Sequence, residues 1–165
     1  MRKQKGFSLI ELLIVVAIIL IIAAIAIPNL LRARIAANES ASASGIRTIN
    51  TAEVSFNSTY PGTGYSAALV DLSDPGNACP AAAPSVTNAC LIDNVLGAGV
   101  KGGYTYGYTP TKGAATNTGY QVAADPTNPG QSGVRSFCSF EDAVVRFTAS
   151  TALKGTCPVA TVPLQ

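Results

Sequence analysis

One carboxylate lies inside an apolar run that is long enough to cross a lipid bilayer. Between Phe7 and Leu31 the only ionisable side chain is Glu11, whereas about 20 apolar residues already make a transmembrane helix. A charged group at the centre of such a helix costs roughly 2.5 to 3.5 kcal/mol on insertion scales, and it usually marks a function. We therefore expect Glu11 to meet a positively charged partner.

Three basic residues, Arg2, Lys3 and Lys5, precede the apolar run. By the positive-inside rule they hold the N-terminus in the cytoplasm, so the chain beyond the run faces outward. The peptide bond next to Gly6 is flexible and open to a protease. Cleavage there would free the amine of Phe7, a candidate counter-ion for Glu11 in the same subunit or in a neighbouring one.

Two simpler interpretations compete for this segment. A secretory signal peptide has an apolar core of about 7 to 15 residues before a small-residue cleavage site, and Ala24-Ile25-Ala26 imitates such a site. The run is too long for that interpretation, and cleavage after it would discard Glu11. A plain single-pass anchor fits the length but leaves Glu11 unexplained.

The stretch Gly6-Phe7-Ser8-Leu9-Ile10-Glu11 resembles the N-terminal signature of the type IV pilin and pseudopilin family. The resemblance is good over residues 1–56 and covers the rest only in general organisation. It implies that a prepilin peptidase cuts after Gly6 and methylates the Phe7 amine. It also implies that Glu11 pairs with the Phe7 amine of an adjacent subunit during filament assembly. Pro28 falls where the family commonly has a helix-bending proline.

The resemblance further implies a place in the cell and a set of partners. The precursor would lie in the bacterial inner membrane with a cytoplasmic N-terminus, and the assembled form would be an extracellular pilus filament. The expected partners are further copies of the chain, the prepilin peptidase, an inner-membrane platform protein and a cytoplasmic assembly ATPase.

The chain of 165 residues has room for one domain beyond a membrane helix. We expect a basic leader at residues 1–6 and a long helix at residues 7–56, of which residues 7–31 lie in the membrane before assembly. If residues 7–56 are all helical, the rod spans about 75 Å. Residues 57–165 would form an extracytoplasmic head, with a connector loop at residues 57–102 and a sheet region at residues 103–165.

The helix is expected to continue past Pro28, because bilayer-embedded helices often absorb a proline. Beyond it, residues recur at spacings of three, four or seven and predict a narrow packing stripe: Leu31, Ile35, Ser42, Ile46, Ile49, Ala52 and Phe56. The charged side chains of this part are expected to lie mostly off that stripe: Arg32, Arg34, Glu39, Arg47 and Glu53.

Turn signals such as Asp74-Pro75-Gly76 replace the helical period after Tyr60-Pro61-Gly62. We expect one short helix at residues 91–96, ended by Gly97. Alternation then predicts strands over 104–109, 119–124, 135–140 and 143–149, and their short connections predict antiparallel pairing. The predicted fold class is α+β and pilin-like, a long N-terminal helix packed on a small antiparallel sheet.

Cys79, Cys90, Cys138 and Cys157 form an even set in the part expected outside the cytoplasm, which favours disulfides. Three connectivities are possible. We prefer Cys79 with Cys90 and Cys138 with Cys157, because both close short loops, each worth roughly 3 kcal/mol in the chain-entropy model. We expect no metal site, since no pair has the C-x-x-C spacing and the chain has no histidine.

The charge balance argues against nucleic acid as a partner. Removing residues 1–6 leaves 8 basic against 9 acidic side chains, so the basic excess belongs to the leader. The lack of histidine removes the commonest general base, and no nucleophile has a recognisable partner arrangement. We expect neither an enzyme nor a cofactor.

The sequence thus predicts the structural subunit of a type IV pilus, assembled through its N-terminal helix. A pseudopilin of a type II secretion system shares the same N-terminal signature and remains an alternative. So does a membrane-anchored binding module that never polymerises. The pattern of the chain does not distinguish a major from a minor subunit.

Overall fold

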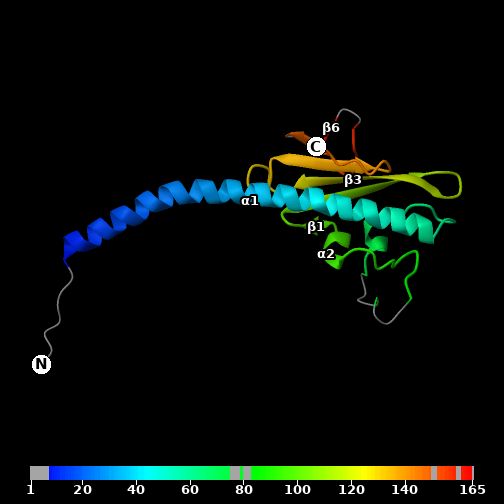
Figure 1. Cartoon of the computed structure of the whole chain (residues 1–165), viewed down its shortest axis with the longest axis horizontal. Helices are drawn as coiled ribbons and strands as arrows, with labels where there is room; N and C mark the ends of the chain where they lie inside the picture. The colour runs from blue at the N-terminus through cyan, green and yellow to red at the C-terminus, as the bar shows by residue number, and fades with distance from the viewer. Residues whose placement is uncertain (1–7, 75–78, 80–82, 150–151, 159–160, 165) are drawn as a thin grey trace, which may run out of the picture. The chain divides into compact units, whose positions relative to one another are not determined.

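The computed structural model describes residues 8–74, 79, 83–149, 152–158 and 161–164. Helix α1 (Leu9–Thr59), the 3-10 helix η1 (Leu69–Leu72) and helix α2 (Asn94–Gly97) precede a six-stranded sheet (Figure 1). The strands are β1 (Val100–Lys101), β2 (Tyr104–Lys112), β3 (Asn117–Pro126), β4 (Arg135–Phe140), β5 (Arg146–Ala149) and β6 (Val162–Pro163). The chain divides into two compact units, Met1–Arg34 and Ile35–Gln165. The predicted α+β class with an antiparallel sheet is confirmed.

Helix α1 ends at Thr59, beyond the predicted end at residue 56. The hydroxyls of Ser55, Ser58 and Thr59 donate to carbonyls one turn earlier in the same helix, so these polar side chains are satisfied within it. The helix stops just before Pro61, because a proline supplies no backbone N–H to continue the hydrogen-bond pattern.

In the unit Ile35–Gln165, one face of α1 packs across the sheet (Figure 1). Ile46, Ile49 and Phe56 are fully buried there, as the predicted stripe requires. The stripe was wrong at its N-terminal end, since Leu31 is exposed and Ile35 is only partly covered. The first buried residue of α1 is Glu39, so burial begins about two turns after Leu31.

The sheet has the strand order β1-β2-β3-β4-β5-β6, with every neighbouring pair antiparallel. One row across it pairs Tyr106 with Ala124, Ala124 with Phe137, and Phe137 with Phe147. These side chains belong to the same core cluster as the buried face of α1. The alternating tyrosines of β2 therefore pack against the helix, which is the ordinary role of aromatic residues on a half-buried strand.

Several predicted boundaries are corrected by the structure. The strand expected at residues 143–149 begins only at Arg146, because Ala143 has a φ of 58° and belongs to a turn. The helix expected at residues 91–96 is α2, which Asp93 caps by accepting a hydrogen bond from the Leu96 amide at 3.0 Å. The connector is also more structured than a loop, since it contains η1 and α2 and gives way to β1 before residue 103.

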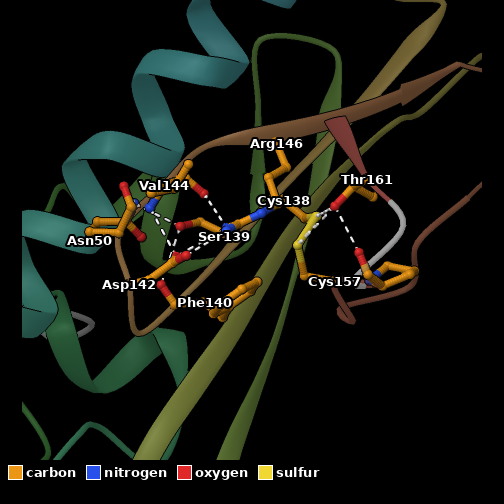
Figure 2. Close-up of polar contacts among 11 residues, drawn as sticks. Asn50, Cys138, Ser139, Phe140, Asp142, Val144, Arg146, Cys157 and Thr161 are labelled. Carbon is orange, nitrogen blue, oxygen red and sulfur yellow. Dashed lines mark hydrogen bonds and ion pairs between the residues drawn. A yellow bond between two sulfur atoms is a disulfide. The ribbon is translucent and has the colours of Figure 1, made fainter. Parts of the chain in front are cut away.

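A C-terminal segment covers the face of β3 that points away from α1. Asp125 accepts hydrogen bonds from the amides of Leu153 and Lys154, both at 2.8 Å. Gln121 accepts one from the Cys157 amide at 2.9 Å. Cys157 is in turn bonded to Cys138 of β4 (Figure 2). Residues 152–158 therefore form a strap that is tied to two neighbouring strands.

Both disulfides have the connectivity that short loops favour, Cys79–Cys90 and Cys138–Cys157. Cys79–Cys90 closes the connector, and Cys138–Cys157 holds the strap. Cys138 and Cys157 lie in a small second core with Ala123 and Leu153.

The close contact between Gly45 and Tyr106 gives a test of the packing of α1. Replacing a helical glycine by alanine ordinarily stabilises by about 0.5 to 1 kcal/mol. At Gly45, however, the new Cβ would lie 2.5 Å from Tyr106 Oη. We expect Gly45→Ala to lower the free energy of unfolding of the full chain in detergent by about 1 to 3 kcal/mol, as overpacked cores do.

Two further variants identify the cause of that loss. Adding Tyr106→Phe to Gly45→Ala removes the clashing hydroxyl and is expected to restore part of the stability. Gly62→Ala is the control, because a Cβ at Gly62 meets nothing within 4 Å. A neutral or stabilising Gly45→Ala change would contradict the packing described here.

The strap predicts where the Cys138–Cys157 disulfide acts. Replacing both cysteines by serine is expected to destabilise the chain by roughly 3 kcal/mol and to expose the amides of Leu153, Lys154 and Cys157 to hydrogen exchange. Replacing Cys79 and Cys90 instead should leave those three amides protected. If these three amides were as well protected from exchange without the Cys138–Cys157 disulfide as without Cys79–Cys90, the strap would stay in place without its disulfide and the prediction would be wrong.

Candidate functional site

The segment of α1 between Leu9 and Leu31 is apolar on every side and exposed in the described chain. Its large apolar residues range from Leu31, which is 44% exposed, to Leu9, which is 80% exposed. Helix α1 is long and apolar enough to cross a membrane. Its most apolar stretch of 18 residues has a mean hydropathy of 3.3, and none of that stretch is buried. A helix that is hydrophobic all round needs lipid or other helices around it.

Glu11 lies in the first turn of α1, within this apolar segment. Its carboxylate accepts a hydrogen bond from the Ser8 amide at 3.0 Å, and the positive end of the helix dipole favours an acid there. Within the described residues Glu11 has no cationic partner. Gly6 and Phe7, the residues of the predicted processing site, lie outside the described residues.

Pro28 lies inside α1, near the C-terminal end of the apolar segment. It has no N–H to offer the carbonyl of Ala24 one turn earlier. Helix α1 nevertheless continues through it without a break. The bend expected at Pro28 stays a prediction.

Four polar side chains of α1 are buried: Glu39, Ser42, Asn50 and Glu53. Three of them, Glu39, Asn50 and Glu53, are hydrogen-bonded to the head. We call these three the polar anchors. Glu39 and Glu53 lie on the buried face, although the charged side chains of this part were expected mostly off the packing stripe. Positions 39, 42, 46, 49, 53 and 56 follow spacings of three and four without a break, so the signal was present. Two of these positions carry glutamate, and charged side chains ordinarily face solvent, which hides the period.

Glu39 binds the start of β4. Its Oε1 accepts hydrogen bonds from the amides of Val134 and Arg135, both at 3.0 Å, and the Arg135 guanidinium lies 2.7 Å from Oε2. Burial alone would raise the pKa of Glu39, but these donors and the positive charge of Arg135 together lower it. The guanidinium also lies over the rings of Phe137 and Phe147, at 5.5 and 5.4 Å from their centroids.

Asn50 joins α1 to two strands and a turn. Figure 2 shows it beside Ser139 of β4. Its amide nitrogen donates to Ser139 Oγ at 3.0 Å and to the Ala143 carbonyl at 3.1 Å. Its amide oxygen accepts from Tyr120 Oη at 2.9 Å. A buried amide with three partners in three elements fixes how the helix meets the sheet.

Glu53 is fully buried and binds the connector and β2. Its Oε1 accepts from Ser66 Oγ at 2.5 Å and from Tyr108 Oη at 2.6 Å, and its Oε2 accepts from the Ser66 amide at 3.1 Å. Burial raises the pKa of this carboxyl. No cation compensates it among the residues that the structure describes.

In the described part of the chain, no three acidic or cysteine side chains come together in a way that suits a metal ion. The arrangement instead serves to hold a long helix on a small sheet while leaving its apolar segment exposed. That segment is suited to binding lipid or another copy of itself.

The sequence of this chain is similar to a known motif and to two known proteins. Residues 1–27 match the model of the prokaryotic N-terminal methylation motif. The chain is 40% identical over 127 residues to the type IV wide pilus major component of Thermus thermophilus, covering 72% of this chain and 92% of that protein. It is 46% identical over 54 residues to the type IV major pilin protein of Myxococcus xanthus, covering 33% of this chain and 24% of that protein.

No solved structure matches the chain. The methylation motif spans the positions of Gly6, Phe7 and Glu11. The first relative extends the likeness from that motif to most of the chain. The long apolar helix and the antiparallel sheet agree with both findings. The chain therefore belongs to the type IV pilin family.

Proposed function

We propose that this pilin works as a structural subunit that is cut after Gly6, methylated at Phe7 and polymerised through α1 into a pilus. The observation that carries the proposal is Glu11, an acid on an exposed apolar helix with no cation beside it in the described residues. The match to the methylation motif over residues 1–27 supports processing at Gly6 and Phe7. A structural role requires no catalytic group.

The proposed sequence of events follows from the apolar segment. Before assembly, residues 7–31 lie in the inner membrane, with the leader at residues 1–6 in the cytoplasm and the head at residues 57–165 outside. Removal of the leader frees the Phe7 amine. Subunits then exchange lipid for other copies of the helix, and Glu11 pairs with the Phe7 amine of a neighbour. A heterologous contact that does not close produces a helical fibre.

The proposed partners are a prepilin peptidase, an inner-membrane platform protein and an assembly ATPase. Both relatives are named as type IV pilus or pilin proteins, which favours a pilus over a type II secretion pseudopilus. Fibres purified from the cell surface and made mainly of this chain would support the pilus. Solubilised monomers without any fibre would support the non-polymerising module instead.

Processing is tested by Gly6→Val, which places a branched side chain at the proposed cleavage site. We expect the unmodified chain to yield a mature protein that starts with N-methylated Phe7, and the variant to keep its leader. Intact-mass and N-terminal peptide mass spectrometry distinguish the two. A mature chain that starts at another residue would overturn the proposed site.

Assembly is tested by Glu11→Gln, which removes the charge and keeps the size of the side chain. We expect normal processing and normal membrane insertion, because neither step uses the charge, together with a severe loss of sheared surface fibre. Glu141→Gln is the matched control, since Glu141 is an exposed acid of the head. A normal fibre yield from Glu11→Gln would disprove the electrostatic role.

A further inference from the structure

Glu53 differs from the other buried acid of α1 in what surrounds it. Glu39 is paired with Arg135 at 2.7 Å. Glu53 is fully buried among neutral donors: Ser66 of the connector and Tyr108 of β2. Other titratable groups that act on it are Tyr120 of β3 and Asp71 of η1. Asp71 is itself an acid, so it disfavours a negative charge on Glu53.

The hydrogen-bond network around Glu53 accommodates an added proton without moving the backbone. In the ionised form, Ser66 Oγ, Tyr108 Oη and the Ser66 amide all donate to the carboxylate, at 2.5, 2.6 and 3.1 Å. Ser66 Oγ also lies 2.9 Å from Tyr108 Oη, and Tyr108 Oη lies 3.1 Å from the Ser66 carbonyl. Both hydroxyls therefore have a second acceptor within reach.

These second acceptors complete a chain of donors in the protonated form. The carboxyl proton of Glu53 is donated to Ser66 Oγ, the Ser66 hydroxyl then donates to Tyr108 Oη, and the Tyr108 hydroxyl donates to the Ser66 carbonyl. The Ser66 amide keeps its bond to Oε2. Every polar group stays paired, while the buried charge, which is costly without a cation, disappears.

We propose that Glu53 is a proton-operated latch that tightens the attachment of α1 to the connector and β2 when the surroundings of the head become acidic. One proton from the medium enters, the carboxylate becomes a carboxylic acid, and the two hydroxyls redirect their bonds. The latch links three segments that are distant in the sequence, so its gain in stability acts on the attachment of the helix as a whole.

The direction of the pH effect separates the two glutamates. Burial raises the pKa of Glu53 above that of an ordinary glutamate. The stability that protonated Glu53 contributes is therefore complete at a pH below the ordinary glutamate pKa, and it is lost as the pH rises through the pKa of Glu53 in the folded chain. The pKa of Glu39 is lowered, so its contribution is complete above the ordinary glutamate pKa and is lost only in stronger acid. Asp71, whose pKa burial also raises, acts in the same direction as Glu53.

The experiment measures denaturant unfolding of the mature full chain in detergent between pH 4.5 and pH 8. We expect the folding equilibrium constant of the unmodified chain to rise as the pH falls, by up to about tenfold per pH unit within the window of one group. Glu53→Gln should remove most of this rise. Glu39→Gln should keep it, and Asp71→Asn should keep the part that belongs to Glu53. A Glu53→Gln variant that retains the whole pH dependence would overturn the latch.

A second measurement needs no substitution and covers the case in which Glu53→Gln does not fold. The side-chain carboxyl carbon of Glu53 in the unmodified chain is followed by NMR as the pH is lowered. We expect it to titrate above the ordinary range of glutamate, and Glu39 to titrate below that range. Titration of Glu53 within or below the ordinary range would overturn the proposal.

Discussion

Helix α1 has to satisfy two different surroundings with one continuous hydrogen-bonded backbone. Up to Leu31 its side chains are apolar all round and require lipid or other helices. From residue 39 onward one face is buried on the sheet, and the opposite face carries small hydroxyl residues such as Thr51 and Ser55, which bond back to their own helix. The second half of α1 has an apolar stripe on one face only, and the sheet of the head buries that stripe.

Three glutamates of α1 show how strongly their surroundings determine what the same side chain does. Glu11 lies on an exposed apolar face and is left to find a cation outside the described chain. Glu39 is buried with an arginine and stays ionised. Glu53 is buried with neutral hydroxyls and favours a proton. We therefore propose assembly as the role of Glu11 and a response to pH as the role of Glu53, whereas Glu39 forms a fixed attachment.

The parts of this molecule that follow a local pattern could be predicted from the sequence. The long helix, the tyrosine strand and the strand Arg135–Phe140 each carry a clear period, and the last has the bounds expected for it. The edge strands β1 and β6 could not be found, since two residues carry no period. The late start of β5 depends on the left-handed backbone at Ala143, and alanine gives no signal for that conformation. The partners of Glu39 and Glu53 lie far along the chain, so only the fold brings them together.

The polar anchors also explain why the helix meets the sheet in one register. A face with only Ile46, Ile49, Ala52 and Phe56 repeats every three or four residues, so a shift by one turn of about 5.4 Å would still bury apolar side chains. Glu39, Asn50 and Glu53 each match one set of partners, in β4, in β3 with the turn before β5, and in the connector with β2. A one-turn slip would leave all three unpaired, at a cost of about 1 to 3 kcal/mol for each buried group and more for a charged one. The buried polar groups therefore select the register, and the apolar stripe supplies most of the attraction.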